Sequence, residues 1–192
     1  MNHLLIIDKI YNKYNENFYK MRLFLILLAA GHGKRLKTRI PKQFREVNNK
    51  TLLEYSLNKF KKFPQIKNIL LVYNKNHKKY LNKLKLKNVI KITGGNTRQE
   101  STFKALKRIN GMNCTKVIIH DAARPNPPKK LIKNLITKLK KNDAVIPVIN
   151  TNDATKRVKD NFVFKNITRE SLKFSQTPQG FTYNKIYQKH KE

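Results

Sequence analysis

Glycines and cations follow the first strongly apolar segment of the chain. The stretch LILLAAGHGKRLKTRIPKQF runs from Leu25 to Phe44 and carries Gly31, Arg35 and Lys42. Glycines let backbone N–H groups approach an anion, while Arg supplies a planar fork for phosphate oxygens and Lys a mobile charge. The stretch is neither a Walker A loop nor a complete dinucleotide fingerprint. It predicts a phosphate-binding loop, with a tight turn and solvated cations as the alternative.

A second cluster, GGNTRQES, occupies residues 94–101. Its double glycine follows an apolar segment and again permits close approach of the backbone to a ligand. Arg98 and Ser101 are three residues apart, which places them on one side of a helix that starts there. An ordinary turn and helix opening remains the other interpretation of this cluster.

A third cluster is HDAARP, residues 120–125. Asp121 ends an apolar strand in a chain with only 11 acidic residues, and a carboxylate facing an anionic ligand favours a divalent cation between them. Ala122 and Ala123 leave room for a ligand, and Arg124 adds a cation. Asp121 as a simple turn cap is the alternative. His120 is predicted to be a packed core histidine.

The elements that must position these clusters alternate along the chain. Strands are predicted at Leu23–Leu28, Asn68–Tyr73, Asn88–Thr93, Lys116–Asp121 and Asp143–Val148, and helices at Leu52–Phe60, His77–Leu86, Glu100–Ile109 and Lys129–Lys141. This alternation indicates an α/β fold with a mostly parallel sheet and helices on both faces. The three clusters follow strands, so we expect them to converge in one crevice at the carboxyl ends. Residues 150–174 break the pattern and predict a protruding β-arm.

Composition limits the remaining possibilities. The 192 residues suit one domain, and no apolar run approaches the length of a membrane span. The net charge of +32 comes from scattered lysines, which favours solvated surfaces over a specific nucleic-acid site. A single cysteine, Cys114, fits the cytoplasm. Residues 1–20 lack a secretory signal pattern and are interpreted as an added helix, or as a start-site artefact if Met21 is the true beginning.

These clusters, together with SQTPQGF at residues 175–181, resemble the 2-C-methyl-D-erythritol 4-phosphate cytidylyltransferases of non-mevalonate isoprenoid synthesis. The resemblance implies a Rossmann-like nucleotidyltransferase fold over residues 21–192. It also implies a reaction in which the substrate phosphate attacks the α-phosphorus of CTP and pyrophosphate leaves, with Mg²⁺ as cofactor. The alternatives are a cytidylyltransferase for another polyol phosphate such as ribitol 5-phosphate, an inactive fragment, and a basic nucleic-acid-binding protein.

The resemblance also assigns roles to residues. It implies catalytic roles for Arg35 and Lys42, and Mg²⁺ binding for Asp121. The residues implied to contact the nucleotide are Ala29, Ala30, Gly31, Gly95, Arg98, Ser101 and Ala122. The residues implied to contact the acceptor are Arg124, Arg169, Thr177 and, as a substitute at a divergent position, Thr155, with Thr151 as the alternative.

The resemblance further implies a homodimer in which the arm carries Arg169 into the partner's site. Two departures accompany it. Ala154 stands where the family has a threonine after an aspartate, and the chain ends at Glu192 without the family's C-terminal segment. We therefore expect an incomplete acceptor pocket. Some family members are fused to a second enzyme of the pathway, so the loss of a C-terminal domain from this chain is an open alternative.

Overall fold

The computed structural model describes residues 3–7, 21–31 and 40–192. The strands are β1 (His3–Ile7), β2 (Leu23–Ala29), β3 (Glu46–Val47), β4 (Lys50–Thr51), β5 (Ile66–Tyr73), β6 (Ile90–Thr93), β7 (Lys116–Asp121), β8 (Ala144–Asn150), β9 (Thr155–Lys159), β10 (Phe162–Ile167), β11 (Lys173–Ser175) and β12 (Gln179–Thr182). The α-helices are α1 (Leu52–Lys61), α2 (Lys78–Leu81), α3 (Arg98–Ile109), α4 (Lys129–Leu139) and α5 (Tyr183–Lys189). Short 3₁₀ helices lie at Lys42–Phe44, Lys75–His77 and Arg169–Ser171.

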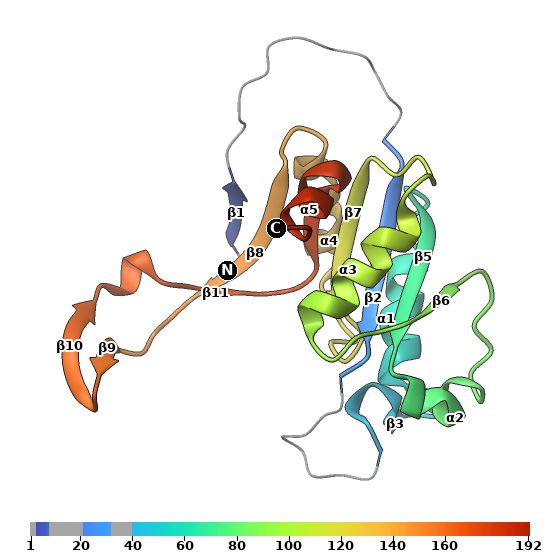
Figure 1. Cartoon of the computed structure of the whole chain (residues 1–192), viewed down its shortest axis with the longest axis horizontal. Helices are drawn as coiled ribbons and strands as arrows, with labels where there is room; N and C mark the ends of the chain where they lie inside the picture. Colours follow the sequence, from blue (N-terminus) through green and yellow to red (C-terminus); the bar gives the residue numbers. More distant parts are fainter. Residues whose placement is uncertain (1–2, 8–20, 32–39) are drawn as a thin grey trace.

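One large sheet forms the centre of the molecule (Figure 1). Its strand order is β1-β8-β12-β7-β2-β5-β6, and β11 pairs with β8 beside this path. Strands β7, β2, β5 and β6 are mutually parallel, whereas β12 runs antiparallel to both β7 and β8. The predicted α/β class with a mostly parallel sheet is confirmed. The parallel strands bring their carboxyl ends to one edge, where the polar clusters follow them.

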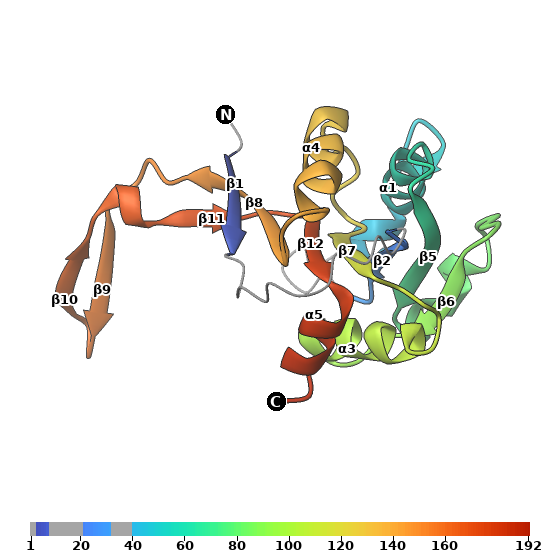
Figure 2. The same ribbon diagram turned by 90° about the horizontal axis from the view of Figure 1, so that it is seen from above.

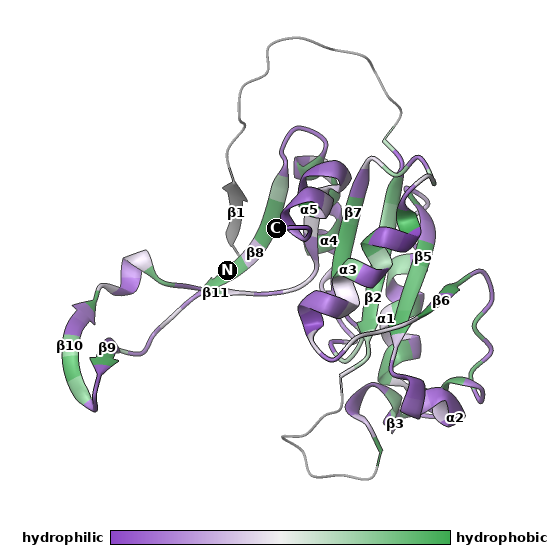
Figure 3. Ribbon diagram, viewed as in Figure 1, coloured by the Kyte–Doolittle hydropathy of each residue, from purple (hydrophilic) through white to green (hydrophobic). Residues whose placement is uncertain are grey.

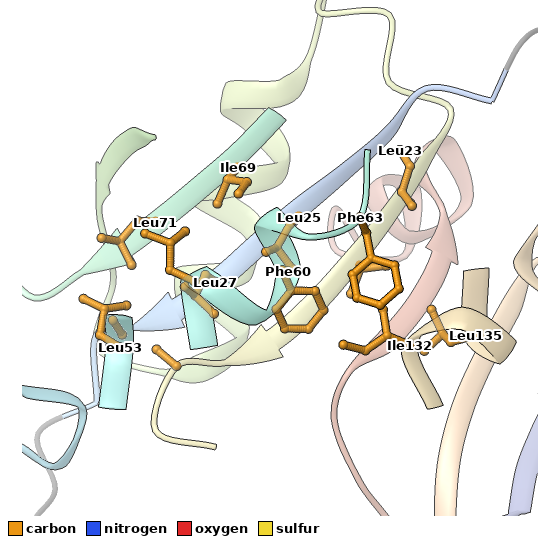
Figure 4. Packing of buried hydrophobic residues seen from close by; sticks show 14 of the residues in the cluster. Leu23, Leu25, Leu27, Leu53, Phe60, Phe63, Ile69, Leu71, Ile132 and Leu135 are labelled. Carbon is orange, nitrogen blue, oxygen red and sulfur yellow. The ribbon is translucent and has the colours of Figure 1, made fainter. Parts of the chain in front are cut away.

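Alternating side chains of β2 supply both hydrophobic layers. Leu25 and Leu27 pack with α1 and α4 on one face, where Phe60 and Ile132 are also buried (Figure 4). Phe24 and Ile26 face the opposite layer, which includes α3 and the start of α5. Figure 2 shows these helix pairs on the two sides of the sheet. Burial on both faces explains the unbroken apolar run of this strand, since a one-sided strand would alternate with polar residues.

Three elements differ from the sequence-based expectations. The helix predicted at His77–Leu86 ends at Leu81. Backbone hydrogen bonds from residue i to residue i−3 follow it, and the partly buried side chains of Leu84 and Leu86 pack against the core from this irregular segment. No strand is predicted from the sequence for the TPQGF segment, but β12 inserts between β7 and β8 and α5 follows it. Residues His3–Ile7 of the N-terminal extension form strand β1, which pairs antiparallel with β8. Residues 8–20, where the added helix could lie, are outside the described residues.

The predicted arm is present as a two-stranded hairpin. Strands β9 and β10 pair antiparallel and project from the body (Figure 1). The hairpin exposes apolar side chains, among them Phe162 at 78% and Phe164 at 66%. Figure 3 shows the apolar colouring of β10 outside the central core. Within the described residues, none of the helices is long and apolar enough to cross a membrane.

Candidate nucleotide-binding site

A cleft of about 780 Å³ lies at the carboxyl ends of β2, β6 and β7. Its lining residues come from the three clusters named from the sequence and are Leu28, Ala29, Ala30, Gly31, Lys42, Gln43, Gly95, Asn96, Thr97, Arg98, Ser101, Asp121, Ala123 and Arg124. The expected convergence of the clusters on one crevice is therefore confirmed. The position also agrees with the general rule for ligand binding in open α/β sheets.

The first wall of the cleft is the chain that leaves β2. Ala29, Ala30 and Gly31 line it, and the buried side chain of Gln43 holds this segment in place. Nε2 of Gln43 donates hydrogen bonds to the carbonyls of Ala29 at 2.7 Å and Gly31 at 3.1 Å. Lys42 is exposed on the same wall, so its ammonium can reach an anion in the cleft. Arg35 lies outside the described residues.

The second wall is the loop between β6 and α3. The buried hydroxyl oxygen of Ser101 accepts a hydrogen bond from the backbone N–H of Gly95 at 3.0 Å. A Cβ atom on Gly94 would lie 2.6 Å from the Cβ of Ala30 and 2.9 Å from the Ser101 hydroxyl oxygen. Only glycine therefore lets this loop pack against the first wall. Ser101 shapes the loop from below while also lining the cleft.

Helix α3 begins under this loop. The Thr97 hydroxyl accepts a hydrogen bond from the N–H of Glu100 at 3.0 Å, which caps the helix. The Glu100 carboxylate accepts from the N–H of Asn96 at 2.8 Å and pairs with Lys104 at 3.1 Å. These two contacts, the Asn96 bond first, lower the pKa of Glu100. Lys104 also donates to the carbonyl of Gly94 at 3.3 Å, so both side chains hold the loop.

Two arginines flank Asp121 at the end of β7. Nε of Arg98 lies 3.3 Å from one carboxylate oxygen, and Nε of Arg124 lies 3.5 Å from the other. Arg124 also donates to the side-chain oxygen of Gln176. All three charged side chains are partly exposed to the cleft. The cleft thus presents two guanidinium groups and one carboxylate at the carboxyl end of β7.

The Asp121–Arg124 turn is fixed from beneath. His120 is fully buried, lies 4.9 Å from the ring of Phe60, and its Nε2 is 2.9 Å from the carbonyl oxygen of Arg124. Burial lowers the pKa of His120 to about 4, so the imidazole is neutral at physiological pH. Ser56 of α1 donates to the carbonyl of Ala122 at 2.9 Å. The prediction of a packed core histidine agrees with this placement.

A second hollow of about 390 Å³ shares Arg124 with the cleft. Its lining includes His120, Gln176, Thr177 and residues of the proline-rich 125–128 loop. The Thr177 hydroxyl accepts from the N–H of Asp121 at 3.5 Å, which ties the C-terminal segment to the end of β7. A small polar ligand in this hollow would lie against Arg124, which also lines the cleft.

Among its described residues, the cleft offers one carboxylate, that of Asp121, as a ligand for Mg²⁺. This ion is usually held by one or two carboxylates together with substrate phosphates and water. Asp121 is a partly exposed carboxylate on the cleft wall, and no group of three or more His, Cys, Asp or Glu gathers anywhere in the described part of the chain. One carboxylate is enough for a metal ion that binds together with a nucleotide. Asp121 would then contact the metal ion, and Arg98 and Arg124 would contact phosphate oxygens instead of Asp121.

Three of the predicted contact residues lie away from the cleft. Ala122 is fully buried in the hydrophobic core, and Ala123 lines the cleft in its place. Thr155 starts β9 and Arg169 lies in the 3₁₀ helix after β10, both on the arm. Within this single chain the arm projects away from the body, so neither residue reaches its own cleft (Figures 1 and 2). Their roles stay predictions.

Sequence reasoning missed several supporting residues. Gln43, Ser56, Glu100 and Gln176 were given no role, although each contacts a cleft segment. Gln43 could have been found from its place beside Lys42 in the Pro-Lys-Gln run, and Glu100 from its spacing of three after Thr97, which is a capping pattern. Ser56 carries no local signal, because its partners lie 66 and 68 residues away.

Comparison with known proteins identifies the family. The pattern of the 2-C-methyl-D-erythritol 4-phosphate cytidylyltransferase family (IspD) matches residues 23–192. The chain belongs to this family. The IspD family membership supports cytidylyl transfer and does not favour the alternatives of another acceptor or a nucleic-acid-binding protein. The enzymes of this family are nucleotidyltransferases, as the four motifs implied.

Individual relatives support the same assignment. The chain is 46% identical over 168 residues to the bifunctional enzyme IspD/IspF of Pelagibacter ubique, covering 88% of this chain and 45% of that one. It is 37% identical over 176 residues to the cytidylyltransferase of Clostridium kluyveri, covering 88% and 75%. The chain therefore spans less than half of the bifunctional relative and about three quarters of the single-function one.

Solved IspD structures have the same fold. The bifunctional IspDF of Campylobacter jejuni superposes with a TM-score of 0.76 at 32% identity, covering 89% of this chain and 43% of that one. The 4-diphosphocytidyl-2C-methyl-D-erythritol synthase of Anaerococcus prevotii superposes with a TM-score of 0.74 at 30% identity, covering 89% and 74%. These matches confirm the expected nucleotidyltransferase fold.

Proposed function

We propose that this chain transfers the cytidylyl group of CTP to 2-C-methyl-D-erythritol 4-phosphate, releasing pyrophosphate and 4-diphosphocytidyl-2-C-methyl-D-erythritol. The observation that carries the proposal is the cleft in which Arg98, Asp121 and Arg124 meet the two glycine-containing loops. Family membership supplies the nucleotide and the acceptor.

The chain's own residues would act by binding and orienting two anions. The backbone of residues 29–31 and of Gly95, which line the cleft, would border the nucleotide, and Lys42 would supply a mobile positive charge toward the phosphates. Arg124 lies between the cleft and the smaller hollow, so it can hold the acceptor phosphate in line with the α-phosphorus. Catalysis by positioning and charge stabilisation needs no covalent intermediate with the protein.

Asp121 would hold Mg²⁺ together with phosphate oxygens of the nucleotide. When bound there, the ion would neutralise charge on the leaving pyrophosphate. Arg98 and Arg124 would then be released from Asp121 and remain close enough to meet phosphate oxygens. Arg35 and Lys42 are proposed to stabilise the charge that develops at the α-phosphorus.

A homodimer is the second part of this proposal. The hairpin of β9 and β10 exposes aromatic side chains at its surface, and Arg169 and Thr155 lie on the same arm. Insertion of the arm into a second copy would bury those side chains and bring Arg169 to the partner's acceptor site. We also propose a cytoplasmic location, in keeping with the nucleotide substrate and the unpaired, buried Cys114.

Pyrophosphate release from purified protein with CTP, Mg²⁺ and 2-C-methyl-D-erythritol 4-phosphate tests the reaction. Parallel reactions with UTP, ATP or ribitol 5-phosphate test the choice of nucleotide and acceptor. The proposal would be supported if pyrophosphate is released only with the pair of CTP and methylerythritol phosphate, and if this release is lost in Lys42→Ala. Folded, dimeric protein that is silent with every pair would contradict it.

A further inference from the structure

The backbone carbonyl oxygen of Arg124 accepts hydrogen bonds from two buried side chains. Nε2 of His120 lies 2.9 Å from this oxygen, and Oγ of Ser56 lies 3.2 Å from it. Because a carbonyl oxygen only accepts, His120 must carry its proton on Nε2. Ser56 has a single proton, which it shares between this oxygen and the carbonyl of Ala122 at 2.9 Å. Both side chains are fully buried.

Histidine is a costly residue at this position. No described residue offers a hydrogen-bond partner to Nδ1 of His120, and the imidazole packs against Phe60 in the apolar layer under α1. A buried polar atom without a partner is unfavourable, so an apolar side chain of similar size would suit packing better. The bond from Nε2 to the Arg124 carbonyl is what a leucine could not provide.

The anchored carbonyl belongs to a residue whose side chain faces the cleft. The N–H of Arg124 donates to the carbonyl of Asp121 at 2.9 Å and closes the turn. The Arg124 guanidinium contacts the Asp121 carboxylate and Gln176. The hydrogen bonds to the backbone carbonyl of Arg124 and the contacts of its guanidinium together determine where the guanidinium lies. Neither Ser56 nor helix α1 otherwise borders the cleft.

We propose that His120 and Ser56 are positioning residues, which direct the Arg124 guanidinium toward the acceptor phosphate by holding its backbone carbonyl. This inference rests on the proposed function for the identity of the acceptor. It predicts that removing either donor weakens acceptor binding, since the arginine would sample orientations that miss the phosphate. Nucleotide binding by the loops after β2 and β6 would be unaffected.

Four variants separate positioning from simple loss of stability. Ser56→Ala and His120→Leu remove the donors, while His120→Gln places an amide N–H near the position of Nε2. Tyr183→Phe is the matched control, because its hydroxyl donates to the buried carbonyl of Leu106 at 3.0 Å on the other face of the sheet. Steady-state kinetics would give KM for the acceptor, KM for CTP and kcat, and thermal unfolding would give the stability of each variant.

We expect the acceptor KM to rise about 3- to 10-fold in Ser56→Ala and in His120→Leu, as suits the loss of one hydrogen bond. The KM for CTP should change less than 2-fold, and His120→Gln should restore most of the acceptor KM. Tyr183→Phe should lower stability without changing the ratio of the two KM values. An unchanged acceptor KM in Ser56→Ala, or an equal rise in Tyr183→Phe, would overturn the inference. If His120→Leu fails to fold, the acceptor KM of Ser56→Ala decides whether the inference holds.

A measurement without substrates keeps this inference separate from the proposed function. The ¹⁵N relaxation of arginine Nε–Hε groups reports side-chain order, and Arg124→Lys would assign the Arg124 signal. We expect an ordered Arg124 signal in the unaltered protein and in Tyr183→Phe, and a more mobile one in Ser56→Ala. Absent turnover in the unaltered protein would refute the proposed function alone. Equal mobility of Arg124 in all variants would refute the positioning role alone.

Discussion

Nε of Arg98 lies 3.3 Å from a carboxylate oxygen of Asp121, although 23 residues separate them in the chain. The contact joins the start of α3 to the end of β7 across the cleft. Arg124 reaches the other oxygen of the same carboxylate, so Asp121 is shared by two cations. A ligand that takes up both arginines would leave this carboxylate available to a metal ion.

Asp121→Asn should abolish most activity with little change in stability. The carboxylate is about one-third exposed, and surface ion pairs contribute about 0–1 kcal/mol to folding. Loss of the only cleft carboxylate among the described residues should reduce kcat on the order of 10²-fold or more. Turnover at several Mg²⁺ concentrations and thermal unfolding would measure both effects. Normal turnover in this variant would refute the metal-binding role of Asp121.

Gln43→Leu should weaken both folding and nucleotide binding. The substitution leaves the carbonyls of Ala29 and Gly31 without their donor. A buried acceptor that loses its partner costs about 1–3 kcal/mol, so urea unfolding should show a loss of this order. Titration with CTP should show weaker binding, because the first wall of the cleft is no longer held. A variant with unchanged CTP affinity would show that this wall is rigid by itself.

Gly94→Ala should distort the loop between β6 and α3. The added methyl group would meet Ala30 at 2.6 Å and Ser101 at 2.9 Å, and these neighbours are parts of the two cleft walls. We expect lower thermal stability and weaker CTP binding. Gly31→Ala is the matched control for stability, since no atom lies within 4 Å of the position that its Cβ would occupy. Equal stability of both variants would contradict the close packing at Gly94.

His120 should make the protein less stable as the pH falls from about 6.5 to about 4. In the folded state its pKa is about 4, below the ordinary value of 6.5, so the unfolded chain binds more protons in this window. The stabilisation is therefore complete above pH 6.5 and declines as the pH falls through the folded pKa. The loss of unfolding free energy due to His120 across this pH range is up to about 3 kcal/mol. Urea unfolding between pH 7 and 4.5 should show this slope, and His120→Gln should reduce it.

The exposed aromatic residues of the arm should control assembly. Replacing Phe162 and Phe164 with serine removes two largely exposed rings from β10 without touching the central core. We expect sedimentation velocity to show a dimer for the unaltered protein and a monomer for the double variant, with equal thermal unfolding of the body. The substitution Val47→Ser, at an exposed apolar residue of the body, serves as the control. A dimer that persists in the double variant would place the interface elsewhere.

A mixed dimer would test the role of Arg169. Arg169→Ala should raise the KM for the acceptor if the arm enters the partner's site. Mixing this variant with Lys42→Ala should restore part of the activity, because one of the two sites then combines both intact residues. Turnover of mixtures at a fixed total concentration is the measurement. Mixtures no more active than the average of the two variants would argue against a shared site.

The local sequence was sufficient to predict the elements around the cleft. The apolar run of β2, the amphipathic pattern of α4 and the polar residues at strand ends are short-range signals, and parallel strands place their carboxyl ends at one edge. Asp121, Arg98 and Gly95 were therefore assigned to one crevice before their distances were known. The four motifs, in order, also indicated the family.

Tertiary structure decided what those signals could not express. Strand β12 lies between β7 and β8 because its backbone completes the ladders of both neighbours, which a four-residue segment does not reveal. The anchoring of Arg124 by Ser56 joins residues that are 68 positions apart. The projection of the arm, which takes Arg169 away from its own cleft, also depends on the whole fold. Local patterns determined the elements and their chemistry, whereas long-range backbone pairing and packing determined which groups meet.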